Sequence, residues 1–168
     1  MLGVIIAVEG TAAISAARIE VLTKMLEQLT DEGALVMGGV EPGRTLAPVK
    51  IPRGMSELSA VARALAHAGQ DHVMVLAVDL KQPNLQLLRY MAMVRAGHDA
   101  VVPEGPDGTV QPMLAIYHGR LTGRAQGLAS SGERNVQALL DDAQVRRVGL
   151  DEVAKFGSPS TLLARGSA

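Results

Sequence analysis

An apolar run that ends in a carboxylate, from Val73 to Asp79, constrains the fold of this chain more than any other feature. Strands that are apolar on both faces are typical of parallel sheets covered by helices on both sides. Apolar residues recur at helical spacing before the run, over 55–68, and after it, over 85–94. The pattern predicts a central strand over 72–78, with Asp79 at the edge of the sheet where open α/β folds bind ligands.

The remaining segments alternate between strand and helix patterns in a way that fits neither an all-α nor an all-β protein. A turn expected at 103–108 would reverse the chain, so that the strand after it runs antiparallel to its neighbours. We therefore expect a single α/β domain over 1–168, a three-layer Rossmann-like sandwich with a mostly parallel sheet and one antiparallel strand. The other expected strands are 2–8, 34–37, 48–51, 100–102, 111–117 and 144–148, with a helix over 16–29 and helical segments after 119.

The composition limits the kind of core, site and partner that this chain can have. Of 168 residues 48% are apolar, with only two Tyr, one Phe and no Trp, so the core must be aliphatic. The absence of cysteine excludes a disulfide framework, a thiolate metal site and a cysteine nucleophile. The net charge of −1 provides no broad attraction for nucleic acid or anionic lipid. The apolar run at 2–8 is too short to span a bilayer, and we expect a cytoplasmic protein.

The four histidines, His67, His72, His98 and His118, lack the spacing of metal ligands. We expect each of them to lie at the surface rather than in a site.

An ordered set of segments in the second half of the chain resembles the molybdenum cofactor guanylyltransferases, which belong to the sugar-nucleotide-transferase-like Rossmann family. No single segment carries the resemblance, but their order and spacing do. It extends from about residue 49 to about residue 148. The segments are 73–79, 85–88, 99–103, 107–108, 111–112, 114–117 and 132–134.

The resemblance implies the transfer of GMP from GTP to the terminal phosphate of molybdopterin or its metal-loaded form, with release of pyrophosphate. It also implies that two catalytic carboxylates, at the positions of Asp79 and Asp107, hold Mg²⁺ against the triphosphate. This agrees with the usual coordination of Mg²⁺ by one or two carboxylates together with substrate phosphates. The resemblance further implies GTP and molybdopterin as ligands, and a second copy of the chain or a molybdoenzyme as possible partners.

The nucleotide would contact Gly10, Thr11, Ser56 and Asp79 in this interpretation. Gly10 and Thr11 precede a predicted helix, whose N-terminus is a weak anion site. The family's long glycine-rich loop is shortened here to 9–15 by roughly a dozen residues, and this stretch contains no Lys or Arg. Because triphosphate binding needs converging N–H groups and a cation, we expect weaker guanylyl transfer than in relatives that keep the loop.

Other interpretations stay open at this stage. A carboxylate at the position of Asp79 can simply satisfy loop amides or cap the next helix, and Asp107-Gly108 is a common turn dipeptide. The scaffold could also serve a non-catalytic protein that binds a nucleotide, a cofactor or a partner protein. A receiver-type domain is disfavoured, because only Glu9 follows the first strand where that fold needs an acidic pair.

Overall fold

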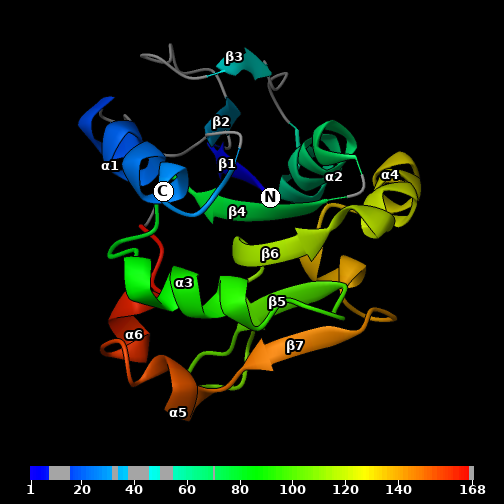
Figure 1. Ribbon diagram of the computed structural model, residues 1–168. Coiled ribbons are helices and arrows are strands. Elements are labelled where there is room, and N and C mark those ends of the chain that lie inside the picture. The colour runs from blue at the N-terminus through cyan, green and yellow to red at the C-terminus, as the bar shows by residue number, and fades with distance from the viewer. Residues whose placement is uncertain (8–15, 32–33, 38–45, 50–54, 70, 167–168) are drawn as a thin grey trace.

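The computed structural model describes residues 1–7, 16–31, 34–37, 46–49, 55–69 and 71–166, and these form a mixed sheet with helices on both faces (Figure 1). Within these residues the sheet has seven strands in the order β3-β2-β1-β4-β6-β5-β7. The strands are β1 (Leu2–Ile6), β2 (Ala34–Met37), β3 (Leu46–Val49), β4 (His72–Ala77), β5 (Ala100–Pro103), β6 (Leu114–His118) and β7 (Val145–Val148).

The strand directions confirm the predicted α/β fold with one reversed strand. β6 pairs antiparallel with both β4 and β5, whereas the other described pairs, from β3 across to β4 and between β5 and β7, are parallel. The sequence pattern predicts that this strand begins at Gln111, but β6 begins at Leu114. The reason is a turn in which the Leu114 N–H donates to the Gln111 carbonyl, and Pro112 within it has no N–H for a sheet ladder.

Helices connect the strands and end at recognisable caps. They are α1 (Ala16–Glu27), α2 (Glu57–Ala68), α3 (Leu85–Met93), α4 (Thr122–Ser130), α5 (Leu150–Val153) and α6 (Pro159–Leu162), with 3₁₀ turns η1 (Gly119–Leu121) and η2 (Val136–Leu139). α2 begins at Glu57, two residues later than expected, because the Ser56 hydroxyl accepts the Ser59 N–H as an N-cap. In the part of the chain that the structure describes, no helix is long and apolar enough to span a membrane.

The helices form two layers around the sheet (Figure 1). α1 and α2 lie on opposite sides of β1, and α2 packs against α4. α3 lies on the α1 side, where the Arg89 guanidinium donates to the Gln28 side chain just after α1 at 3.3 Å. This arrangement is the three-layer sandwich that the strand and helix alternation predicts.

β4 lies at the centre of an aliphatic core. Residues Val73 to Ala77 are fully buried, as expected for a strand covered on both faces. Tyr117 of β6 is a large polar side chain buried beside it, and its hydroxyl donates to the Pro112 carbonyl at 2.6 Å. Burial raises the pKa of Tyr117 far above its usual value, so this side chain is a neutral donor within the core.

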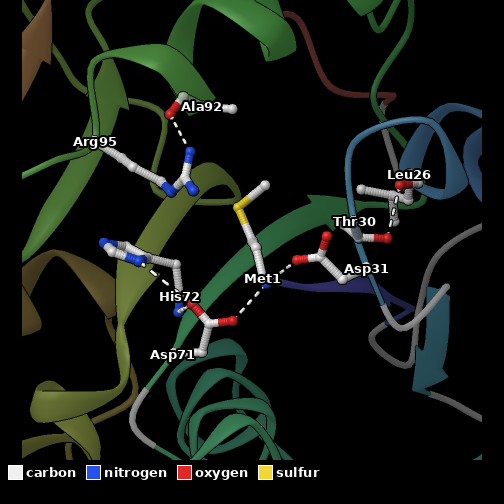
Figure 2. Close-up of polar contacts among 8 residues, drawn as sticks. All are labelled: Met1, Leu26, Thr30, Asp31, Asp71, His72, Ala92 and Arg95. Atoms are coloured by element: carbon white, nitrogen blue, oxygen red, sulfur yellow. Dashed lines mark hydrogen bonds and ion pairs between the residues drawn. The ribbon is translucent and has the colours of Figure 1, made fainter.

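A cluster of charged groups lies at the edge of the sheet where β4 begins (Figure 2). The amino group of Met1 contacts the carboxylates of Asp31, at 2.9 Å, and Asp71, at 2.5 Å. Beside it the rings of His72 and His118 meet edge to face, with centroids 4.6 Å apart. His67 is exposed, as expected, whereas His72, His98 and His118 are only partly exposed. Sheet pairing of β4 with β6 brings His72 against His118, which local sequence patterns do not reveal.

His72 makes stability depend on pH. Its pKa lies below the usual value of about 6.5, chiefly because of burial and also because of His118 and Arg95, while Asp71 opposes the shift. The unfolded chain therefore takes up a proton at a higher pH than the folded chain, and stability falls as the pH drops below about 6.5. Urea unfolding at about pH 7.5 and about pH 5.5 should show this loss, and His72→Gln should reduce it. An equal loss in His72→Gln would contradict the assignment; His67→Gln is the control.

Gly119 is required because the start of η1 lies close to the main chain of Gly69, at the end of α2, and of Asp71, just before β4. A Cβ at this position would lie 2.0 Å from the Gly69 carbonyl oxygen and 2.9 Å from that of Asp71. Gly119→Ala should therefore lower the free energy of unfolding by about 1–3 kcal/mol or more. Gly123→Ala, in exposed helix with open space around it, should be neutral or stabilising by up to about 1 kcal/mol. Equal stabilities of the two variants in denaturant titrations would refute this interpretation.

Candidate active site at the carboxyl edge of the sheet

Asp79 lies just beyond the carboxyl end of β4, as the apolar run predicted. The Val78 N–H still donates to the Ile6 carbonyl of β1, and a turn at Leu80 then ends the ladder. The Asp79 side chain is only 14% exposed. Its carboxylate is therefore held close to the neighbouring strands instead of extending into solvent. It does not cap α3, whose N-cap is Asn84.

The guanidinium of Arg165 pairs with the Asp79 carboxylate. Arg165 Nε donates to Asp79 Oδ1 at 2.9 Å and to Oδ2 at 3.1 Å, while Arg165 Nη1 donates to Glu57 Oε1 at 2.6 Å. Burial alone would lower the pKa of Arg165, but the two carboxylates raise it above its usual value. One cation thus links the end of β4 to the start of α2.

Main-chain hydrogen bonds hold Arg165 in place independently of its side chain. The Gly166 N–H donates to the Asp79 carbonyl at 2.6 Å, the Lys81 N–H donates to the Ala164 carbonyl at 2.9 Å, and Leu80 and Arg165 form an antiparallel bridge. The Gln111 amide donates to the Leu163 carbonyl at 3.0 Å from the other side. Residues 163–166 are therefore fixed between the loop after β4 and the turn before β6.

Asp107 lies in that turn, and its local role is structural. The Thr109 N–H and hydroxyl donate to Asp107 Oδ1 at 3.1 and 2.6 Å, which lowers the pKa of Asp107. Gly108 follows with φ of +77°, a conformation that suits glycine. The dipeptide therefore builds the turn, as the alternative interpretation of the sequence held.

A cavity of about 180 Å³ separates this turn from α6. Asp107, Val110 and Gln111 line one side, and Ser160, Leu163 and Ala164 line the other. Asp79 is not part of this lining. The two predicted carboxylates thus adjoin the same segment, 163–166, from different sides: Asp79 through Arg165, and Asp107 across the cavity.

The predicted nucleotide contacts are only partly described. Gly10 and Thr11 lie outside the described residues. Ser56 is buried, and its hydroxyl is engaged by the N-terminus of α2. One basic side chain of α1 does reach this edge, because Arg18 donates to the Lys81 carbonyl at 3.0 Å. Lys24 instead pairs with Glu20 on the exposed face of α1, at 2.7 Å.

The carboxylates of Asp79 and Asp107 are the kind of ligand that a hard divalent cation prefers, although both already accept hydrogen bonds. Carboxylate oxygens are the protein ligands that Mg²⁺ and Mn²⁺ prefer. Both Asp79 oxygens accept from Arg165, and Asp107 Oδ1 accepts from Thr109. Among the described residues, no three or more His, Asp or Glu side chains are grouped to hold a metal ion. A cation at Asp79 must therefore exchange with the guanidinium.

Sequence reasoning missed Arg165 and Glu57. Asp79 and Arg165 lie 86 residues apart, and Glu57 reads locally as a first-turn acidic residue of a helix. No spacing rule joins these three positions. The only local signal is that a polar segment with Pro159 follows the last strand, which indicates a short final turn and no more.

The model of the MobA-like NTP transferase domain matches residues 19–148. A Mycobacterium marinum protein named "Probable molybdenum cofactor guanylyltransferase" is 30% identical over 128 residues, which cover 71% of this chain and 64% of the relative. The chain thus matches less than two thirds of the length of that relative.

Solved structures share the fold. Molybdopterin-guanine dinucleotide biosynthesis protein A from Archaeoglobus fulgidus aligns over 96% of this chain and 95% of its own, with a TM-score of 0.70 and 16% identity. A Mycobacterium tuberculosis protein solved as a complex with manganese aligns over 88% of this chain and 86% of its own, with a TM-score of 0.61 and 15% identity. With the match to residues 19–148, which includes β4 and both candidate carboxylates, the chain belongs to the MobA-like NTP transferase family.

Proposed function

We propose that this chain transfers GMP from GTP to the terminal phosphate of molybdopterin or its metal-loaded form. In this reaction a phosphate oxygen of the acceptor attacks the α-phosphorus of GTP, and the bond to the β-phosphate breaks to release pyrophosphate. The observation that carries the proposal is the position of Asp79 at the carboxyl end of β4, inside the segment matched by the family. Open α/β sheets bind their ligands at this edge.

Asp79 and Asp107 are the proposed ligands of Mg²⁺. The bound cation would neutralise triphosphate charge, which is the main requirement of phosphoryl-type transfer. Arg18 of α1 reaches the loop after β4, where it donates to the Lys81 carbonyl, and among the described side chains of α1 it is best placed to add positive charge near the phosphates. Ser56 would act through the N-terminus of α2 rather than through a free hydroxyl, since its oxygen already accepts the Ser59 N–H.

The cavity between the 105–111 turn and α6 is the proposed place of the acceptor. It opens beside Asp107, and Gln111 provides an amide at its wall. A cavity of about 180 Å³ holds part of a pterin phosphate rather than the whole molecule. The product would be used by a molybdoenzyme, and we expect a cytoplasmic location and self-association to accompany this function.

A second function is favoured by the Arg165–Asp79 ion pair itself. A carboxylate already neutralised by a guanidinium suits a protein that binds a nucleotide, a cofactor or a partner without transferring a nucleotidyl group. The two functions differ in one equilibrium property. The transferase should bind GTP more tightly when Mg²⁺ is present, whereas a binding protein that uses Arg165 in place of a cation should show no dependence on Mg²⁺.

We expect slow turnover from the unmodified chain. Loss of one preorganised hydrogen-bond donor typically lowers the rate about a hundred- to a thousandfold. The shortened 9–15 stretch offers several fewer such donors than the family's long glycine-rich loop. Incubation with GTP, Mg²⁺ and molybdopterin should therefore release pyrophosphate slowly. A family-type glycine-rich loop grafted between Val8 and Ala16 should raise the rate. Fast turnover without the graft would contradict this expectation and would indicate that Arg18, Lys24 or a second subunit supplies the missing charge.

Asp79→Asn should reduce the residual turnover by at least about a hundredfold, because a neutral amide cannot balance a cation at the phosphates. Asp107→Asn should act in the same direction. Asp142→Asn is the matched control, since Asp142 is 85% exposed and precedes β7 at the opposite edge of the sheet. Pyrophosphate release is the measurement, with thermal melting to verify folding. Full activity in a folded Asp79→Asn variant would rule out the proposed site.

A further inference from the structure

We propose that Arg165 is an internal competitor of the divalent cation at Asp79, so that the cation binds only when the guanidinium leaves this carboxylate. The inference rests on the proposed function in one respect, the assignment of Asp79 as a cation ligand. It goes further by giving a role to a residue outside the family match and to the segment that carries it.

The geometry makes the competition direct. Arg165 Nε lies 2.9 and 3.1 Å from the two Asp79 oxygens, the atoms that a metal would use. A guanidinium and a divalent cation at one carboxylate repel each other in a partly buried site, where water screens their charges poorly. The Asp79 side chain is only 14% exposed and that of Arg165 only 28%, so little water can screen the repulsion between the guanidinium and a divalent ion.

The main chain makes Arg165 a persistent competitor. Its neighbours in the 163–166 segment are bonded to the Asp79 carbonyl, the Lys81 N–H and the Gln111 amide. These bonds do not involve the guanidinium and keep it beside Asp79 at a high effective concentration. A divalent ion from solution therefore competes with a tethered cation rather than with water alone.

Glu57 makes the exchange reversible without displacing the segment. Its Oε1 accepts from Arg165 Nη1 at 2.6 Å, through a nitrogen different from the one that faces Asp79. When a cation takes Asp79, Arg165 can keep this second ion pair at the start of α2. The guanidinium is then free on its Nε side, and the backbone bonds of residues 163–166 need not break.

Mn²⁺ binding tests the inference without any measurement of activity. We would titrate Mn²⁺ into the full chain without nucleotide and measure free Mn²⁺ by electron paramagnetic resonance. Arg165→Gln should bind at least about tenfold more tightly than the unmodified chain, because the charge-assisted bifurcated hydrogen bond from Arg165 Nε no longer opposes the metal. Arg89→Gln removes one exposed guanidinium from α3 and should leave the affinity unchanged. Asp79→Asn combined with Arg165→Gln should lose the gained binding.

A second measurement uses the unmodified chain, in case Arg165→Gln folds poorly. Saturating Mg²⁺, which is diamagnetic, should shift the side-chain Nε–H resonance of Arg165 and leave that of Arg89 in place. Mg²⁺ binding with an unmoved Arg165 resonance would overturn the inference, as would equal Mn²⁺ affinities in folded Arg165→Gln and the unmodified chain.

The two failures are distinguishable. If Asp79→Asn abolishes pyrophosphate release while Arg165→Gln leaves Mn²⁺ affinity unchanged, the proposed function stands and the competition is refuted. If folded Arg165→Gln binds Mn²⁺ through Asp79 more tightly than the unmodified chain does, but no variant releases pyrophosphate, the competition stands and the transferase activity is refuted. If neither Mn²⁺ binding nor pyrophosphate release depends on Asp79, both are refuted.

Discussion

The burial of β4 on both faces is the constraint on which the rest of the molecule depends. Five consecutive apolar residues, 73–77, can avoid water only between two helical layers, and β1 and β6 must pair with the strand to satisfy its main chain. The first residue able to carry a charge is then Asp79, one residue beyond Val78. A strand built for the core thus delivers a carboxylate to the edge of the sheet.

That carboxylate cannot stay unpaired in its half-buried position. A charge removed from water needs a partner, and the chain provides Arg165 from its far end. The same guanidinium also pairs with Glu57, so that α2, the loop after β4 and residues 163–166 are joined by one cation. Most of the value of such a pair lies in avoiding an isolated buried charge, which is why a competing metal could replace it.

The sequence allowed the central strand, the flanking helices and the reversed strand to be predicted, because periodicity and turn residues are local signals. Asp79 could be placed at the carboxyl edge for the same reason. The Arg165–Asp79–Glu57 cluster could not, since it joins three distant segments whose side chains meet only after folding. The later start of β6 and of α2 likewise depends on particular hydrogen bonds, at Gln111 and at Ser56, that a hydrophobic pattern does not contain.

The proposed function requires that a nucleotide binds at the carboxyl edge of the sheet around Asp79. Chemical-shift mapping of the labelled chain with GTP and Mg²⁺ tests it most directly. We expect the perturbed amides to cluster in the loop 79–81, the turn 105–111 and the segment 163–166, and the start of β4 at His72 to be unaffected. Saturable GTP binding whose shifts avoid these three segments would contradict it.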